Sequence, residues 1–242
     1  MTNNSEDPRR AFLVRALSLG LFAGSGAAQL LQLSHAMGEI PRKLPDGRSI
    51  YRLEGSVFVD GKRANIDTVI GPGSLVKTGS GSHVIFVVAS DAFILRGNSE
   101  VRMQSSDGLL IEGMRLVAGR LLSVFGKRQK PHNILTPTAT IGIRGTGIYL
   151  ESDEEKSYVC TCYGRTRIAA NANPDVSKDI VSKHHDEPVY VLPSGSDKKL
   201  IVPAPFINHT DAELALIEEL VGRTTPFAYS GTAYDAPRKR NY

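Results

Sequence analysis

The two cysteines of this chain stand two residues apart, at Cys160 and Cys162. The residues around them, from Tyr158 to Tyr163, are rich in β-branched and aromatic side chains and predict a strand. Residues two apart on a strand leave the same face, with Cα atoms about 6.6 Å apart. That distance is near the limit for a disulfide, and the two Cβ vectors run parallel rather than convergent. We therefore expect two thiols side by side and no bond between them.

Two adjacent histidines, His184 and His185, follow the cysteines about twenty residues later. Thiolates and imidazoles together suit zinc or copper(I), because soft sulfur and borderline nitrogen ligands select those ions. Cys160, Cys162, His184 and His185 are thus the candidate metal ligands. Neighbours in an extended segment point to opposite faces, so only one histidine joins the thiols unless the pair lies on a turn. Asp186 is a candidate to orient an imidazole.

A plainer interpretation stands beside the metal site, because free cysteine also packs as a small apolar side chain. The sequence contains no Gly-x-Ser-x-Gly, no His-Glu-x-x-His and no second cysteine pair, which are patterns of known hydrolytic or redox sites. We therefore expect a protein that is not an enzyme. No cofactor is assured, and zinc or copper is the candidate ion.

The first 36 residues have the features of an export signal. A polar start ends in Arg9 and Arg10, and a short apolar centre follows. The exit is placed after Ala36, where Ser34 and Ala36 are small residues two apart, with Ser25-Gly26-Ala27 as the alternative. The paired arginines before Ala-Phe-Leu resemble the twin-arginine transport signal. The apolar run is broken before the roughly 20 residues that a membrane span needs. We expect cleavage, a periplasmic location in a bacterium, and no transmembrane span in the mature chain.

The composition of the chain indicates a folded domain and argues against nucleic acid as its partner. The chain has 29 Lys plus Arg against 25 Asp plus Glu, a formal net charge of +4, and 41% hydrophobic residues. That apolar share is enough for a buried core. The slight positive excess is far from the dense basic stripe that neutralises many phosphates. Nucleic acid is therefore not an expected partner.

Short apolar clusters alternate with turn signals from about residue 50 to residue 170, for example at Asp60-Gly61 and Gly71-Pro72-Gly73. No sustained helical period occurs there, so the prediction is a mainly β fold with many short strands. One helix is predicted near the C-terminus, over 211–221, because Thr210 and Glu213 form a capping box before an apolar stripe. We expect this helix to pack over the β module, with partner binding as the alternative.

The stretch 136–147, Thr-Pro-Thr-Ala-Thr-Ile-Gly-Ile-Arg-Gly-Thr-Gly, resembles the FecR domain, as does the Gly-Pro-Gly region from 71 to 82. The resemblance covers about residues 53–170. It implies a periplasmic β module, a roll or solenoid of short strands, that in its relatives relays or scaffolds protein contacts. Structural roles are expected for six residues of the motif, with the arginine donating to turn carbonyls or to an internal carboxylate: Thr136, Pro137, Gly142, Arg144, Gly145 and Thr146.

The resemblance does not extend to the anti-sigma function, because only about 15 residues precede the apolar segment, too few for a cytoplasmic domain. The expected organisation is a signal (1–36), a lead-in (37–52), the FecR-like domain (53–170) and a C-terminal extension (171–242). The extension is expected to hold a loop over the polar residues 171–178, then strands, the helix and a tail. The expected function is a non-catalytic interaction or scaffold module whose partner is another envelope protein or a cell-wall component. The alternative is a periplasmic metal-binding or metal-sensing protein.

Overall fold

A computed structural model describes residues 43–128 and 132–227. The expected export signal, with Arg9 and Arg10, lies outside the described residues. Within the described ranges the chain is mainly β, as the turn and strand patterns predict, with its one long helix near the C-terminus. No helix in these ranges combines the length and apolar composition needed to cross a membrane.

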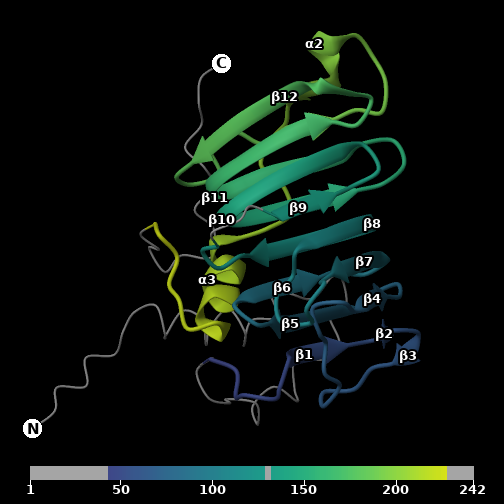
Figure 1. Cartoon of the computed structure of the whole chain (residues 1–242), viewed down its shortest axis with the longest axis vertical. Helices are drawn as coiled ribbons and strands as arrows, with labels where there is room; N and C mark the ends of the chain where they lie inside the picture. Colours follow the sequence, from purple (N-terminus) through teal and green to yellow (C-terminus); the bar gives the residue numbers. More distant parts are fainter. Residues whose placement is uncertain (1–42, 129–131, 228–242) are drawn as a thin grey trace, which may run out of the picture.

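The strands form a 14-stranded sheet (Figure 1). The first seven are β1 (Ile50–Glu54), β2 (Val57–Val59), β3 (Lys62–Arg63), β4 (Leu75–Thr78), β5 (His83–Val88), β6 (Asp91–Leu95) and β7 (Ser99–Gln104). The later strands are β8 (Gly113–Val124), β9 (His132–Leu135), β10 (Ala139–Ser152), β11 (Ser157–Ala170), β12 (Asn173–Ser182), β13 (Val189–Val191) and β14 (Ile201–Pro203). The helices are α2 (Asp197–Leu200) and α3 (Asp211–Leu220).

Most neighbouring strands of the sheet are antiparallel. The main path runs β14-β13-β11-β10-β9-β8-β7-β4-β2-β3, while β12 pairs with β11, and β5 joins β1 to β6. The pairing of β8 with β9 is parallel. The hairpin of β10 and β11, 14 residues in each strand, is the longest pairing and supplies the platform for the site described below.

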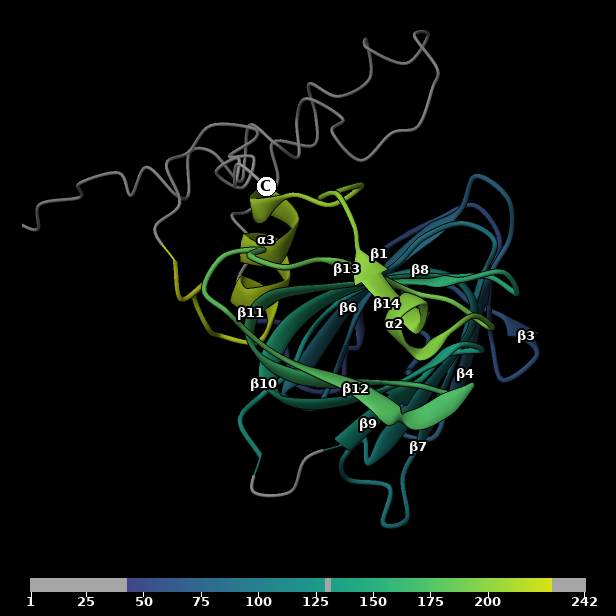
Figure 2. The same cartoon turned by 90° about the horizontal axis from the view of Figure 1, so that it is seen from above.

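The curved sheet has apolar side chains on both faces. Viewed from above, the strands bend around an interior, and α3 lies outside the bend beside β6, β10 and β11 (Figure 2). Residues such as Phe86, Leu116 and Ile141 fill the interior core. A second core lies under α3, where Tyr149 and both cysteines meet Leu214 and other apolar residues of the helix. Alternation of side chains along a strand builds both cores from the same strands.

The helix predicted over 211–221 is confirmed, and its limits follow from local signals. The Thr210 hydroxyl accepts a hydrogen bond from the backbone N–H of Glu213, and the Glu213 carboxylate accepts one from the Thr210 N–H. The helix ends at Leu220, and Gly222 adopts φ +72°, the left-handed conformation that commonly stops a helix.

The polar segment 171–178, expected as a loop, forms most of strand β12 instead. Its residues pair with the outer edge of β11, where Arg167 lies opposite Asp179 and their side chains form an ion pair of 3.1 Å. Polar residues suit this strand because most of its side chains are not fully buried. The boundary expected after residue 170 therefore falls in the turn of a paired hairpin.

Candidate metal centre

Four side chains that could bind a metal meet in the second core: Cys160, Cys162, His185 and His209. The cysteines lie on β11, His185 lies on the bend after β12, and His209 lies just before α3. Their thiol sulfurs and ring nitrogens all lie within 4.8 Å of one another, and all four residues are buried. Three separate segments of the chain thus deliver two sulfur and two nitrogen ligands to one place.

The distances between these atoms match the edges of a coordination tetrahedron. The Cys160 sulfur lies 3.5 Å from His185 Nδ1, and the Cys162 sulfur lies 3.4 Å from His209 Nε2. His185 Nδ1 and His209 Nε2 are 3.1 Å apart. Tetrahedral zinc with its usual bond lengths has sulfur–nitrogen edges of about 3.5 Å and nitrogen–nitrogen edges of about 3.3 Å. Three of the six distances among the four atoms are therefore close to those around a zinc ion, and the other three are each no longer than 4.8 Å.

A strained bend explains how one histidine of the pair turns inward. His185 has φ +53°, and its backbone N–H donates to the carbonyl of Cys162 at 2.9 Å. Asp186 does not orient an imidazole; its carboxylate accepts a hydrogen bond from the Lys183 N–H at 2.7 Å and so closes the bend. His184, the other expected ligand, lies outside the group of four and is only half-buried.

Each buried imidazole has a second hydrogen-bond partner that leaves the inner nitrogen free for a metal. His185 Nε2 lies 3.0 Å from Asp211 Oδ1, and His209 Nδ1 lies 2.7 Å from the carbonyl oxygen of Ile207. With these outer nitrogens donating, His185 would bind a metal through Nδ1 and His209 would bind it through Nε2. His184 shares the same carboxylate, with Nε2 at 2.8 Å from Asp211 Oδ2. Such partners are typical of metal-bound histidines.

The electrostatics of the cluster favour one thiolate beside a charged imidazole. Burial raises the pKa of the Cys160 thiol, but the hydrogen bond with Cys162 and the interactions with His209 and His185 outweigh it, so the pKa lies well below its ordinary value. Burial and the neighbouring Cys160 raise the pKa of Cys162. Burial lowers the pKa of His185, yet hydrogen bonds with Asp211 and Cys160 raise it to about 9 overall.

Aromatic rings enclose the group of four. The rings of Tyr149 and His209 stack with centroids 4.3 Å apart. Phe206 lies against both imidazoles, at 4.6 Å from His185 and 4.5 Å from His209. The sulfur and nitrogen atoms of the group are therefore buried and shielded by aromatic rings.

The segment that carries His209 is fixed from both sides. Arg96, the first residue after β6, donates hydrogen bonds to the Asn208 carbonyl at 2.9 Å and to the Glu213 carboxylate at 2.7 Å. The capping box of Thr210 and Glu213 holds the next turn. Asp211 is thereby placed as the first residue of α3, with its carboxylate against His185.

The residues of the 136–147 stretch lie elsewhere, in and before β10. The Thr136 hydroxyl accepts from the Ala139 N–H at 2.9 Å, and the Pro137 carbonyl accepts from Asn171 at 3.1 Å. Gly142 lies within β10, Gly145 has φ +59°, and the buried Thr146 hydroxyl donates to the Arg165 carbonyl at 3.0 Å. Arg144 is exposed, and among the described residues it makes no hydrogen bond to a turn carbonyl or to a carboxylate.

Two residues of the centre are missing from the sequence-based candidates. His209 is 47 residues from Cys162 along the chain and has no spacing that ties it to the cysteines. Asp211 follows it by two residues, at the start of the helix. The one feature of the sequence that could have indicated His209 is its position directly before the capping box of Thr210 and Glu213, which holds the adjacent backbone in place.

Comparisons with known proteins leave the family unassigned. No protein-family model matches the chain, and no curated protein does. Two crystal structures described as a "putative anti-sigma factor" from Parabacteroides distasonis ATCC 8503 are similar in part, with a TM-score of 0.44 and identities of 12% and 14%. The alignments cover 54% of this chain, and the chain spans 58% of theirs. Similarity at this level assigns neither activity nor partner, and membership of the FecR family stays a prediction.

Proposed function

We propose that this protein is a non-catalytic β module whose C-terminal helix is fastened to the sheet by a buried zinc ion. The observation that carries the proposal is that three of the six distances among the four buried sulfur and nitrogen atoms are close to tetrahedral edges, at 3.4–3.5 Å between sulfur and nitrogen and 3.1 Å between the nitrogens, with all four atoms within 4.8 Å of one another. The ligands are Cys160, Cys162, His185 and His209.

Zinc is favoured over copper by the number and kind of ligands. Two sulfurs and two imidazole nitrogens in a tetrahedral arrangement suit zinc, whereas copper(II) prefers tetragonal geometry and copper(I) prefers softer, sulfur-rich sites. The alternative is that the same four side chains bind copper(I) and sense it. Identifying the bound metal distinguishes this alternative from the zinc site.

A structural role follows from the closed coordination shell. Catalytic zinc keeps one position open for water or substrate, while structural zinc uses four protein ligands. Here four protein atoms supply the whole shell, and Tyr149 and Phe206 cover two of them. The proposed ion therefore stabilises the fold instead of activating a substrate.

Titration of the metal-free, reduced protein with cobalt(II) and zinc tests the proposal. We expect one ion per chain, visible cobalt bands of tetrahedral geometry with thiolate charge transfer, and displacement of cobalt by zinc. His209→Gln is expected to abolish the tetrahedral spectrum. Asp211→Asn, which keeps all four ligands, is expected to retain the spectrum and to weaken affinity about 10–100-fold.

A histidine outside the centre provides the matched control. His83 lies on β5, near Glu54, with 3.6 Å between His83 Nδ1 and the carboxylate. His83→Gln removes one imidazole from the chain and should leave cobalt binding unchanged. Unchanged cobalt spectra in His209→Gln, or loss of binding in His83→Gln to the same extent, would contradict the assignment of ligands.

Export to the periplasm is proposed alongside, supported by the features of residues 1–36. The twin-arginine route transports folded proteins, so the ion could be inserted before export. We further propose that the module acts there by binding another envelope protein or a cell-wall component.

Fractionation of the native host tests the periplasmic location. We expect the full-length precursor to yield a shorter periplasmic form, and we expect the variant Arg9→Lys/Arg10→Lys to prevent the formation of that shorter form. An uncleaved chain in the membrane fraction would overturn the export proposal.

A further inference from the structure

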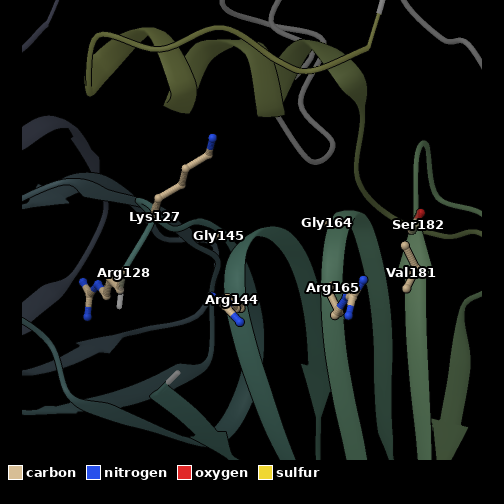
Figure 3. A pocket seen from close by; sticks show the side chains of 8 residues that line it. All are labelled: Lys127, Arg128, Arg144, Gly145, Gly164, Arg165, Val181 and Ser182. Carbon is tan, nitrogen blue, oxygen red and sulfur yellow. The ribbon is translucent and has the colours of Figure 1, made fainter. Parts of the chain in front are cut away.

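A cavity of about 600 Å³ lies where β10 and β11 lose their regular register near Gly145 and Gly164, beside the end of β12 (Figure 3). Its lining is rich in positive side chains and, among the described residues, includes no acidic one. The residues are Lys127, Arg128, Arg144, Gly145, Gly164, Arg165, Val181 and Ser182. We propose that this cavity binds a small ligand through a multiply charged oxyanion group, such as a phosphate or polycarboxylate.

The strongest observation is the pairing of Arg144 directly with Arg165 in the β10–β11 register. Figure 3 shows the two side chains on neighbouring strands at the edge of the cavity. Both are exposed, and neither forms an ion pair with an acidic side chain among the described residues. Like charges placed directly opposite on a sheet are destabilising. A bound anion would offset that repulsion, and guanidinium groups fit phosphate or carboxylate oxygens with two parallel hydrogen bonds.

Irregular backbone at the same place holds this arrangement. The register of β10 with β11 breaks between Arg144 and Gly147, and both Gly145 (φ +59°) and Gly164 (φ +91°) are left-handed. A Cβ on Gly164 would lie only 2.8 Å from the carbonyl oxygen of Gly145. A side chain at position 164 is therefore excluded, and the two strands stay close where the arginines face each other.

Lys127 supplies a third positive charge. Its side chain packs against Gly145, with Lys127 Cγ 3.4 Å from the position of a Cβ there, and its amine extends towards the side of α3 (Figure 3). Arg128 contributes less, because it forms an ion pair with the buried Asp91 and donates to the Ile111 carbonyl. In the part of the chain that the structure describes, Arg144, Arg165 and Lys127 form no ion pair, and three such positive charges favour a ligand group with more than one negative charge.

A second cavity, of about 500 Å³, shares Lys127, Gly145, Gly164 and Ser182 with the first. Its walls add the rings of Tyr163 and Phe227. The acidic residue Glu218 also lines it, and its carboxylate accepts hydrogen bonds from Arg223 at 2.6 Å and from the Tyr163 hydroxyl. Because the two cavities adjoin, a ligand could place its anionic group in the first cavity and its apolar part against the rings of the second.

Calorimetric titration of the metal-loaded chain with inorganic pyrophosphate and, separately, with malonate tests the proposal. We expect at least one of them to bind with a dissociation constant below about 1 mM at low salt and to weaken as salt is added. Binding of pyrophosphate alone would identify phosphate as the group, and binding of malonate would identify carboxylate. If neither binds the wild-type chain, the proposal is overturned.

Charge-matched variants separate a built site from general attraction. In R144Q/R165Q we expect at least tenfold weaker binding and, without ligand, a higher melting temperature than wild type, because the repulsion is removed. The control R48Q/R167Q removes two exposed arginines that are paired with Asp67 and Asp179, and it should bind as wild type does. Equal binding by R144Q/R165Q and the wild type would contradict the site.

Discussion

His132, the first residue of β9, is buried against the ring of Phe125, with centroids 4.7 Å apart. Neither ring nitrogen has a hydrogen-bond partner among the described residues. Burial, together with the charge of Arg128, lowers the pKa of His132 to about 4. The folded protein therefore holds this imidazole neutral, while the unfolded chain takes up a proton as the pH falls below about 6.5.

This pKa shift makes stability fall with acidification. Between pH 6.5 and pH 4 the unfolded state binds more protons at His132 than the folded state, so the free energy of unfolding decreases as the pH falls through that window. The contribution lost between pH 7 and pH 5 is about 2 kcal/mol. The free energy of unfolding of the His132→Leu variant should therefore fall by about 2 kcal/mol less than that of the wild type between pH 7 and pH 5. Urea unfolding of both proteins at pH 7 and pH 5 measures the difference, and equal losses would contradict it.

At the residue scale the sequence predicts three of the four proposed ligands and omits the fourth. Cys160 and Cys162 could be paired because a strand fixes where residues two apart point. His185 could be predicted as a candidate ligand from its residue type. That it, and not His184, turns towards the cysteines follows from its positive φ, which the sequence does not reveal. His209 reaches the site through tertiary packing of α3, which no spacing in the sequence encodes.

The element that depends most on the proposed ion is α3. Its capping box and apolar stripe predict the helix, because both are local patterns. Its position on the sheet depends on distant contacts, including those of Arg96 with Glu213 and of Asp211 with His185. β12 shows the opposite case: a polar segment becomes a strand because the edge of β11 is available for pairing.

Removal of the ion should loosen α3 before the rest of the sheet. Two of the four ligands, His185 and His209, lie outside β11, on the bend at 183–186 and before the helix. Without zinc we expect hydrogen exchange to accelerate at least tenfold in that bend and in α3, while β4 to β8 exchange as before, because local segments open with their own free energies. Uniform acceleration across the sheet, or none in α3, would count against this coupling.

At the scale of the whole molecule, one curved sheet carries two apolar cores. Within the described ranges the interior core contains none of the proposed metal ligands, and the alternating strands that build it account for the fold class predicted from the sequence. The second core brings together β11, the bend after β12 and the entry to α3, and both cysteines lie in it. Which strands pair across the sheet could not be predicted, because short strands of similar composition allow many orders.

The metal content of the protein most directly tests the central claim that Cys160, Cys162, His185 and His209 hold one zinc ion. Protein purified from its native compartment, without metal-affinity steps or chelators, should contain about one equivalent of zinc per chain by elemental analysis. His209→Gln purified in parallel should contain almost none. Less than about a tenth of an equivalent of zinc in the wild-type protein would contradict the account, and about one equivalent of copper in its place would replace zinc with copper(I).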